Sequence, residues 1–187
     1  MSTKKAVPKK VKTQTEPGPD HKTNKMLVNV VLDRSGSMSR LRDDTVAGYN
    51  EYLNGLRADK DNEYFVTLIQ FDKPSGDPEL TIKYVDRPLA DVSALAREDF
   101  EPRGMTPLYD GIGECVRRID AKGRQVLVVI ITDGMENASA EFTKDMIKTL
   151  IAEKEKEHWT FTFLGANIDS YAVGGGLGAN AANVANY

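Results

Sequence analysis

Four short apolar runs along the chain predict buried strands. They cover residues 26–32, 64–71, 125–131 and 159–164. Runs of this length with few polar positions are typical of strands covered on both faces of a parallel sheet. Residues 80–85 alternate between apolar and polar positions instead. We therefore expect an edge strand there, running antiparallel to the others.

Helical spacing of apolar residues marks the segments between these strands. Helices are expected over about 40–56, from Pro107 to the Lys122-Gly123 stop, and over 143–157, where the apolar face consists of Met146, Ile147, Leu150 and Ile151. A short helix near 92–96, another over 168–178 and a brief strand within 180–187 complete the predicted elements. Strands that alternate with helices predict an α/β fold, with a doubly wound, Rossmann-like and mostly parallel sheet flanked by helices and one antiparallel edge strand.

The first 25 residues differ in composition from the remainder of the chain. They hold seven lysines, three prolines and only two acidic residues. Because nothing in this stretch can bury an apolar face, we expect a flexible basic arm over residues 1–25 and one domain over 26–187. The arm is either a solvated tail or an anchor to an assembly.

Overall composition limits the possible partners and compartments. The formal net charge of −3 argues against specific binding of nucleic acid. The single cysteine, Cys115, permits no disulfide within the chain and is expected in the core. No segment is apolar enough to span a membrane, and the lysines near the start are not followed by the apolar run of a secretory signal. We therefore expect a cytoplasmic protein, or a virion component assembled in a cytoplasm.

Oxygen-bearing side chains gather where the predicted strands end. Asp33, Ser35 and Ser37 follow the first strand, Thr106 precedes a helix, and Asp133 follows the strand at 125–131. In an open α/β sheet the carboxyl ends of the strands form one edge, so these residues are expected to lie together. Two carboxylates and three hydroxyls suit Mg²⁺, with Mn²⁺ or Ca²⁺ as alternatives. These loops contain no His or Cys, which argues against zinc.

This pattern resembles a known family. Asp33-x-Ser35-x-Ser37, a separate Thr106 and a separate Thr132-Asp133-Gly134 are similar to the metal-ion-dependent adhesion site (MIDAS) of von Willebrand factor A (vWA) domains. The resemblance implies that Ser35, Ser37 and Thr106 contact the metal and that both aspartates bind it directly or through water. It also implies metal-dependent adhesion, in which a partner protein offers an Asp or Glu to the ion. The sequences around the motif look most like bacterial and phage members, many of which work beside a MoxR-type ATPase.

Three other interpretations remain at this point. A Mg²⁺-dependent phosphatase with Asp33 as nucleophile would need a second acid where Ser35 stands. A serine hydrolase would need a G-x-S-x-G elbow and a nearby base, but His158 precedes the last strand and should lie at the opposite end of the sheet. A structural, decorating component of a phage or other assembly could be anchored by the basic arm. Four further polar residues near the site either support it or are plain surface: Asp72, Asp110, Glu136 and Asn137.

Overall fold

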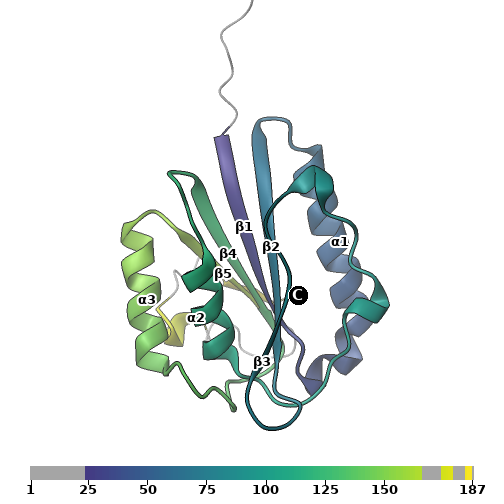
Figure 1. Cartoon of the computed structure of the whole chain (residues 1–187), viewed down its shortest axis with the longest axis vertical. Coiled ribbons are helices and arrows are strands. Elements are labelled where there is room, and N and C mark those ends of the chain that lie inside the picture. Colours follow the sequence, from purple (N-terminus) through teal and green to yellow (C-terminus); the bar gives the residue numbers. More distant parts are fainter. Residues whose placement is uncertain (1–23, 166–173, 179–183, 187) are drawn as a thin grey trace, which may run out of the picture.

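A single six-stranded sheet forms the centre of the protein (Figure 1). The computed structural model describes residues 24–165, 174–178 and 184–186. The strands are β1 (Asn24–Asp33), β2 (Asn62–Asp72), β3 (Glu79–Pro88), β4 (Gln125–Thr132), β5 (Thr160–Gly165) and β6 (Val184–Asn186), in the order β3-β2-β1-β4-β5-β6. Among the strands that the structure describes, only β3 pairs antiparallel, and it lies at an edge of the sheet. The predicted fold class is confirmed.

Helices cover the two faces of the sheet unequally. In Figure 1, α1 (Arg42–Ala58) lies on one face, whereas α2 (Leu108–Arg118) and α3 (Lys144–Lys156) lie on the other. The central strand β1 contributes to both cores. Leu27 and Val31 pack with α2 and α3, whereas Val28, Val30 and Leu32 pack with α1. This alternation explains why β1 is an almost unbroken apolar run.

Two predicted features are wrong. Residues 92–96 do not form a helix, although 3₁₀ turns lie on either side at Leu89–Asp91 and Arg97–Asp99. The Asn50 side chain bonds both the N–H and the C=O of Leu95, so these backbone groups are satisfied without a helix. Met146 is also not buried: it is 46% exposed, at the margin of the α3 face that buries Ile147 and Ile151.

The remaining elements agree with expectation as far as the structure describes them, except that α2 ends at Arg118, before the predicted Lys122-Gly123 stop, because Ile119 is already extended. β6 falls within the predicted 180–187 segment, and Cys115 is fully buried. Of the predicted 168–178 helix, only 174–178 are described, and 174–176 are helical. β1 begins at Asn24, so residues 1–23 of the predicted arm lie outside the described residues. Within the described ranges, no helix is long and apolar enough to cross a membrane.

Candidate metal site

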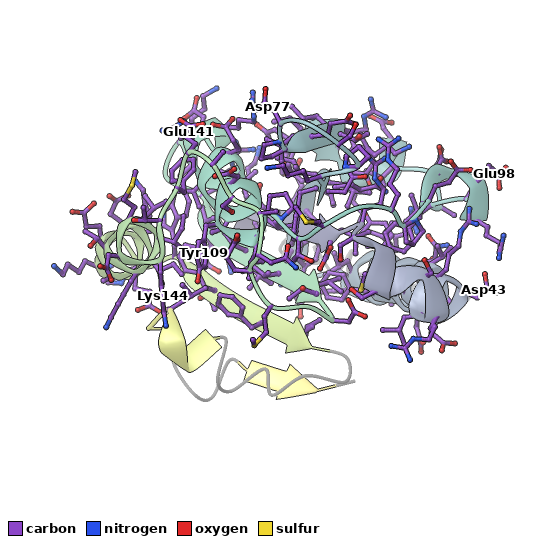
Figure 2. The ribbon with its side chains drawn as sticks, turned by 90° about the horizontal axis from the view of Figure 1, so that it is seen from below. Asp43, Asp77, Glu98, Tyr109, Glu141 and Lys144 are labelled. Carbon is purple, nitrogen blue, oxygen red and sulfur yellow. The ribbon has the colours of Figure 1, made fainter. Side chains whose placement is uncertain are left out.

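The predicted site lies at the edge where the parallel strands end. β1 ends at Asp33 and its neighbour β4 ends at Thr132, with Leu32 paired to Ile131. Figure 2 looks onto this edge, with Tyr109 of the first turn of α2 left of the middle and Asp43 of α1 at the right. The loops after β1 and β4 are therefore adjacent because their strands are adjacent.

Hydroxyl groups connect the loop after β1, which holds Ser35 and Ser37, to Asp133 after β4. The Oγ atoms of Ser35 and Ser37 are 3.1 Å apart. Ser37 Oγ donates a hydrogen bond of 2.6 Å to Asp133 Oδ1. Residues separated by almost a hundred positions in the sequence thus form one polar chain.

Asp33 is fully buried beneath this chain. Its Oδ1 accepts the N–H of Ser35 at 2.7 Å, and its Oδ2 accepts the hydroxyl of Thr132 at 2.6 Å. Burial raises the pKa of Asp33 to about 6, against the lowering effect of these hydrogen bonds, and the charge of Asp133 raises it further. The role of Thr132 was missed in the sequence, where it was noted only as part of Thr132-Asp133-Gly134. The sequence could have indicated this contact, because Thr132 ends the strand next to β1, level with Asp33.

Thr106 reaches the site across Gly134. A Cβ placed on Gly134 would lie 3.1 Å from Thr106 Oγ1 and 3.5 Å from Ser37 Oγ, so the two hydroxyls flank this glycine. The Thr106 N–H donates to Asn137 Oδ1 at 2.9 Å, and the Asn137 N–H donates to the Thr106 carbonyl at 3.1 Å. The structure therefore brings all five predicted residues together, and Asn137 supports one of them.

Backbone hydrogen bonds tie the Thr106 loop to its neighbours. Gly36 N–H donates to Gly104 O at 3.0 Å, and Met105 N–H donates to Lys73 O at 2.9 Å. Gly104 has φ +67°, and a Cβ there would lie only 2.1 Å from the Lys73 carbonyl oxygen. Only glycine fits this close approach without displacing the chain.

Two of the polar residues left open by the sequence support loops. Asp110 accepts the backbone N–H groups of Ala140, Glu141 and Phe142. Glu136 accepts the N–H groups of Tyr109, Ala138 and Ser139. These hydrogen bonds tie the first turn of α2 to the segment between β4 and α3, which contains Asn137.

The donor set fits a hard divalent cation. Asp33, Ser35 and Thr106 are at most 3% exposed and Asp133 is 9% exposed, whereas Ser37 is at the surface. Among the described residues, neither aspartate forms an ion pair with a Lys or Arg. Two neighbouring carboxylates without a counter-charge, bordered by hydroxyl oxygens, are an environment that a cation would stabilise.

Histidine, the usual base of a serine hydrolase, is not found beside these hydroxyls in the described part of the chain. His158 lies directly before β5, at the amino ends of the parallel strands, as the sequence predicted. It is therefore at the far end of the sheet from Ser35 and Ser37.

Comparison with solved structures identifies the fold. No protein-family model matches the sequence, and a search of curated proteins finds no match either. The chain is similar to proximal thread matrix protein 1 (PTMP1) of the mussel byssus, with a TM-score of 0.63, 16% identity, and 88% of this chain and 42% of that chain covered. It is also similar to the VWA domain of SpRpn10, with a TM-score of 0.52, 11% identity and 88% of both chains covered. The chain has a vWA fold.

Metal ions are present in two solved structures of similar fold. One PTMP1 structure has a zinc-occupied MIDAS motif, at a TM-score of 0.57 and 15% identity over 89% of this chain and 42% of that one. The manganese-loaded TRAP protein of Plasmodium vivax matches with a TM-score of 0.58 and 14% identity over 89% of this chain and 69% of that chain. The present chain spans less than half the length of PTMP1. At these identities, the structural likeness shows the fold alone.

Proposed function

We propose that this chain is a protein-binding domain in which a divalent cation, Mg²⁺ by preference, captures a carboxylate of a partner protein. The observation that carries the proposal is the pair Asp33 and Asp133. They are close enough for the charge of one to raise the pKa of the other, are linked through hydroxyls, and lack a basic partner in the part of the chain that the structure describes.

Each of the five residues has a role in this proposal. The hydroxyl oxygens of Ser35, Ser37 and Thr106 would hold the ion, and Asp33 and Asp133 would bind it directly or through water. Hard oxygen donors favour Mg²⁺, with Mn²⁺ or Ca²⁺ as substitutes. Two carboxylates and three neutral hydroxyls leave the ion electrophilic, so it supplies an attachment point for an outside carboxylate. Such a charge-assisted bond can anchor an interface.

Exposed methionines beside the site favour a protein as the partner. Met105 precedes Thr106 and is 45% exposed, and Met135 follows Gly134 and is 71% exposed. Methionine is an adaptable apolar side chain that recurs on protein-binding surfaces. A carboxylate-binding ion with apolar side chains next to it fits an acidic residue that is presented among apolar neighbours.

Phosphoryl transfer fits these residues less well. A nucleophilic aspartate needs an oxygen that substrate can reach, but Asp33 is fully buried and each of its oxygens already accepts a hydrogen bond. The residue two positions later, Ser35, cannot act as a carboxylic acid. We therefore propose binding and not turnover as the function.

Calorimetric titration with Mg²⁺ or Mn²⁺ tests the metal site. Wild type should bind one ion, and Asp33→Ala should lose binding by more than about a hundredfold, because a charged ligand is removed. Asp120→Ala, a change of the same type on an exposed residue at the other end of the sheet, should bind like wild type. Equal binding by wild type and Asp33→Ala would refute the site.

A pull-down with and without EDTA tests the protein partner. The captured protein should be lost with EDTA and also with Asp33→Ala. A MoxR-type ATPase and a subunit of a phage or other cytoplasmic assembly are the partners to look for first. Capture that is unchanged by EDTA would leave a binding domain that does not use the metal.

A further inference from the structure

A second fully buried aspartate lies next to the metal site. Asp72 is the last residue of β2, and the structure places it between two arginines. Arg34 Nη2 donates to Asp72 Oδ1 at 2.8 Å, and Arg103 Nε donates to Asp72 Oδ2 at 2.7 Å. Arg103 continues through its Nη2 to Glu79 Oε2 at 2.6 Å. The two oxygens of the Asp72 carboxylate therefore bridge two arginine side chains.

The two arginines belong to the two loops that carry hydroxyls of the site. Arg34 stands between Asp33 and Ser35, and Arg103 precedes Thr106 by three residues. The backbone of these loops also meets, since Arg103 N–H donates to the Arg34 carbonyl at 2.7 Å. Asp72 thus fixes the separation between the loop of Ser35 and the loop of Thr106.

The charge of Arg34 gives Asp72 a second effect. Arg34 is only 8% exposed and follows directly on Asp33. Its Nε has no hydrogen-bond partner among the described residues, and Asp72 is the one carboxylate there with which it forms an ion pair. Charges interact strongly where water is excluded, so without Asp72 the buried guanidinium would lose its counter-charge and its place in the loop would be destabilised.

We propose that Asp72 is a positioning residue for the metal site: through Arg34 and Arg103 it holds the two hydroxyl-bearing loops together, and it balances the buried charge of Arg34, the residue between Asp33 and Ser35. This inference rests on the proposed function, because it concerns the affinity of the same site for its cation. Asp72 does not touch the ion and acts only through the two arginines.

The test compares two Arg–Asp pairs at opposite ends of the sheet. Asp86 forms a two-pronged pair with Arg124, at 2.7 and 2.8 Å, near the amino end of β4. Asp72→Asn should weaken Mg²⁺ binding about tenfold to a hundredfold, the usual effect of removing a group that orients ligands. Asp86→Asn should change the free energy of unfolding but leave the Mg²⁺ dissociation constant within about twofold of wild type, since its pair touches no ligand loop. Calorimetry gives the affinity and urea unfolding gives the stability of each protein.

A second variant keeps the test decisive if Asp72→Asn does not fold. Arg103→Gln removes one of the two bridges from an exposed side chain and leaves the Arg34–Asp72 pair intact. It should weaken Mg²⁺ binding several-fold in a folded protein. Mg²⁺ affinity equal to wild type in Arg103→Gln, and in Asp72→Asn where that variant folds, would overturn the positioning role while leaving the metal site intact. Absence of Mg²⁺ binding by wild type would instead overturn the proposed function, and this inference with it.

Discussion

Asp33 and Asp72 are two fully buried aspartates at the ends of neighbouring parallel strands, yet their surroundings are opposite. Asp33 pairs with Phe71 across the ladder, so Asp72 lies one residue further along β2. Asp72 is held between two arginines. Asp33 receives only the neutral donors of Ser35 and Thr132.

In the proposed function, this difference makes Asp33, and not Asp72, the carboxylate that is available to an added cation. A buried carboxylate with two guanidinium partners has its charge balanced within the fold. For Asp33 the balance is missing, and burial raises its pKa to about 6. The protein places arginines one strand away but not on Asp33, which is the arrangement expected of a site that stays available to a metal.

Asp72→Asn should have the largest effect on stability. It leaves the Arg34 charge buried without its counter-ion, and breaking a buried pair in this way costs about 3–5 kcal/mol of unfolding free energy. Urea unfolding of the metal-free protein measures the loss. Asp86→Asn breaks a partly exposed pair and should cost less than about 1 kcal/mol. A similar loss in both variants would show that Asp72 is no more important than a surface partner.

The same substitution at Asp33 should act in the opposite direction. Asp33→Asn removes a buried charge that the metal-free protein compensates poorly, so at pH 8 the variant should be more stable than metal-free wild type, by up to about 3 kcal/mol. Mg²⁺ should raise the melting temperature of wild type but not that of the variant. If Asp33→Asn destabilised the metal-free protein as much as Asp72→Asn does, the contrast between the two aspartates would be refuted.

The pH dependence of metal-free stability should follow from Asp33 as well. Its pKa is raised from 3.8 to about 6 on folding, so the folded state holds the proton more tightly between these values. The stabilising contribution is complete below about pH 4 and is lost as the pH rises through about 6, up to about 3 kcal/mol. Denaturant unfolding between pH 4 and 8 measures this loss. The loss should be absent in Asp33→Asn, and an unchanged pH profile in that variant would assign it to other groups.

Mg²⁺ affinity should change with pH in the opposite direction, because the ion needs the deprotonated carboxylate. Binding should strengthen as the pH rises to about 6 and then level off. Affinity that is constant from pH 4.5 to 8 would show that Asp33 does not titrate in the site.

The sequence predicts that these residues share one edge of the sheet, for a physical reason. The strands containing Leu32 and Ile131 are apolar enough to be central and parallel, and parallel strands deliver the residues that follow them to one edge. Asp33 and Asp133 could therefore be placed together without knowing any side-chain contact. Whether they and the three hydroxyls bind a metal stays a prediction.

The bridge at Asp72 could not be derived in the same way. Its partner Arg103 lies in the long connection between β3 and α2, where no periodicity fixes the path of the chain. The path of this connection is set by individual contacts, such as the hydrogen bonds of the Asn50 side chain to the Leu95 backbone. These bonds satisfy the backbone of Leu95, within the segment 92–96 where a helix was expected. The prediction that Met146 is buried is wrong because helical spacing shows which residues share a face of the helix. It does not show how much of that face the neighbouring elements cover.

The smallest expected effect concerns Asn137, which supports Thr106 through a single side-chain hydrogen bond. Asn137→Ala removes the acceptor of the Thr106 N–H at the partly exposed rim, so it should cost about 1 kcal/mol of stability and weaken Mg²⁺ binding only a few-fold. Asn137→Asp keeps an acceptor at the same position and should retain the stability. Calorimetry on both variants ranks this contact against the Asp72 bridge. If Asn137→Ala weakened Mg²⁺ binding more than Asp72→Asn, the Thr106 loop would be positioned mainly from the β4 side and not by the arginine bridge from β2.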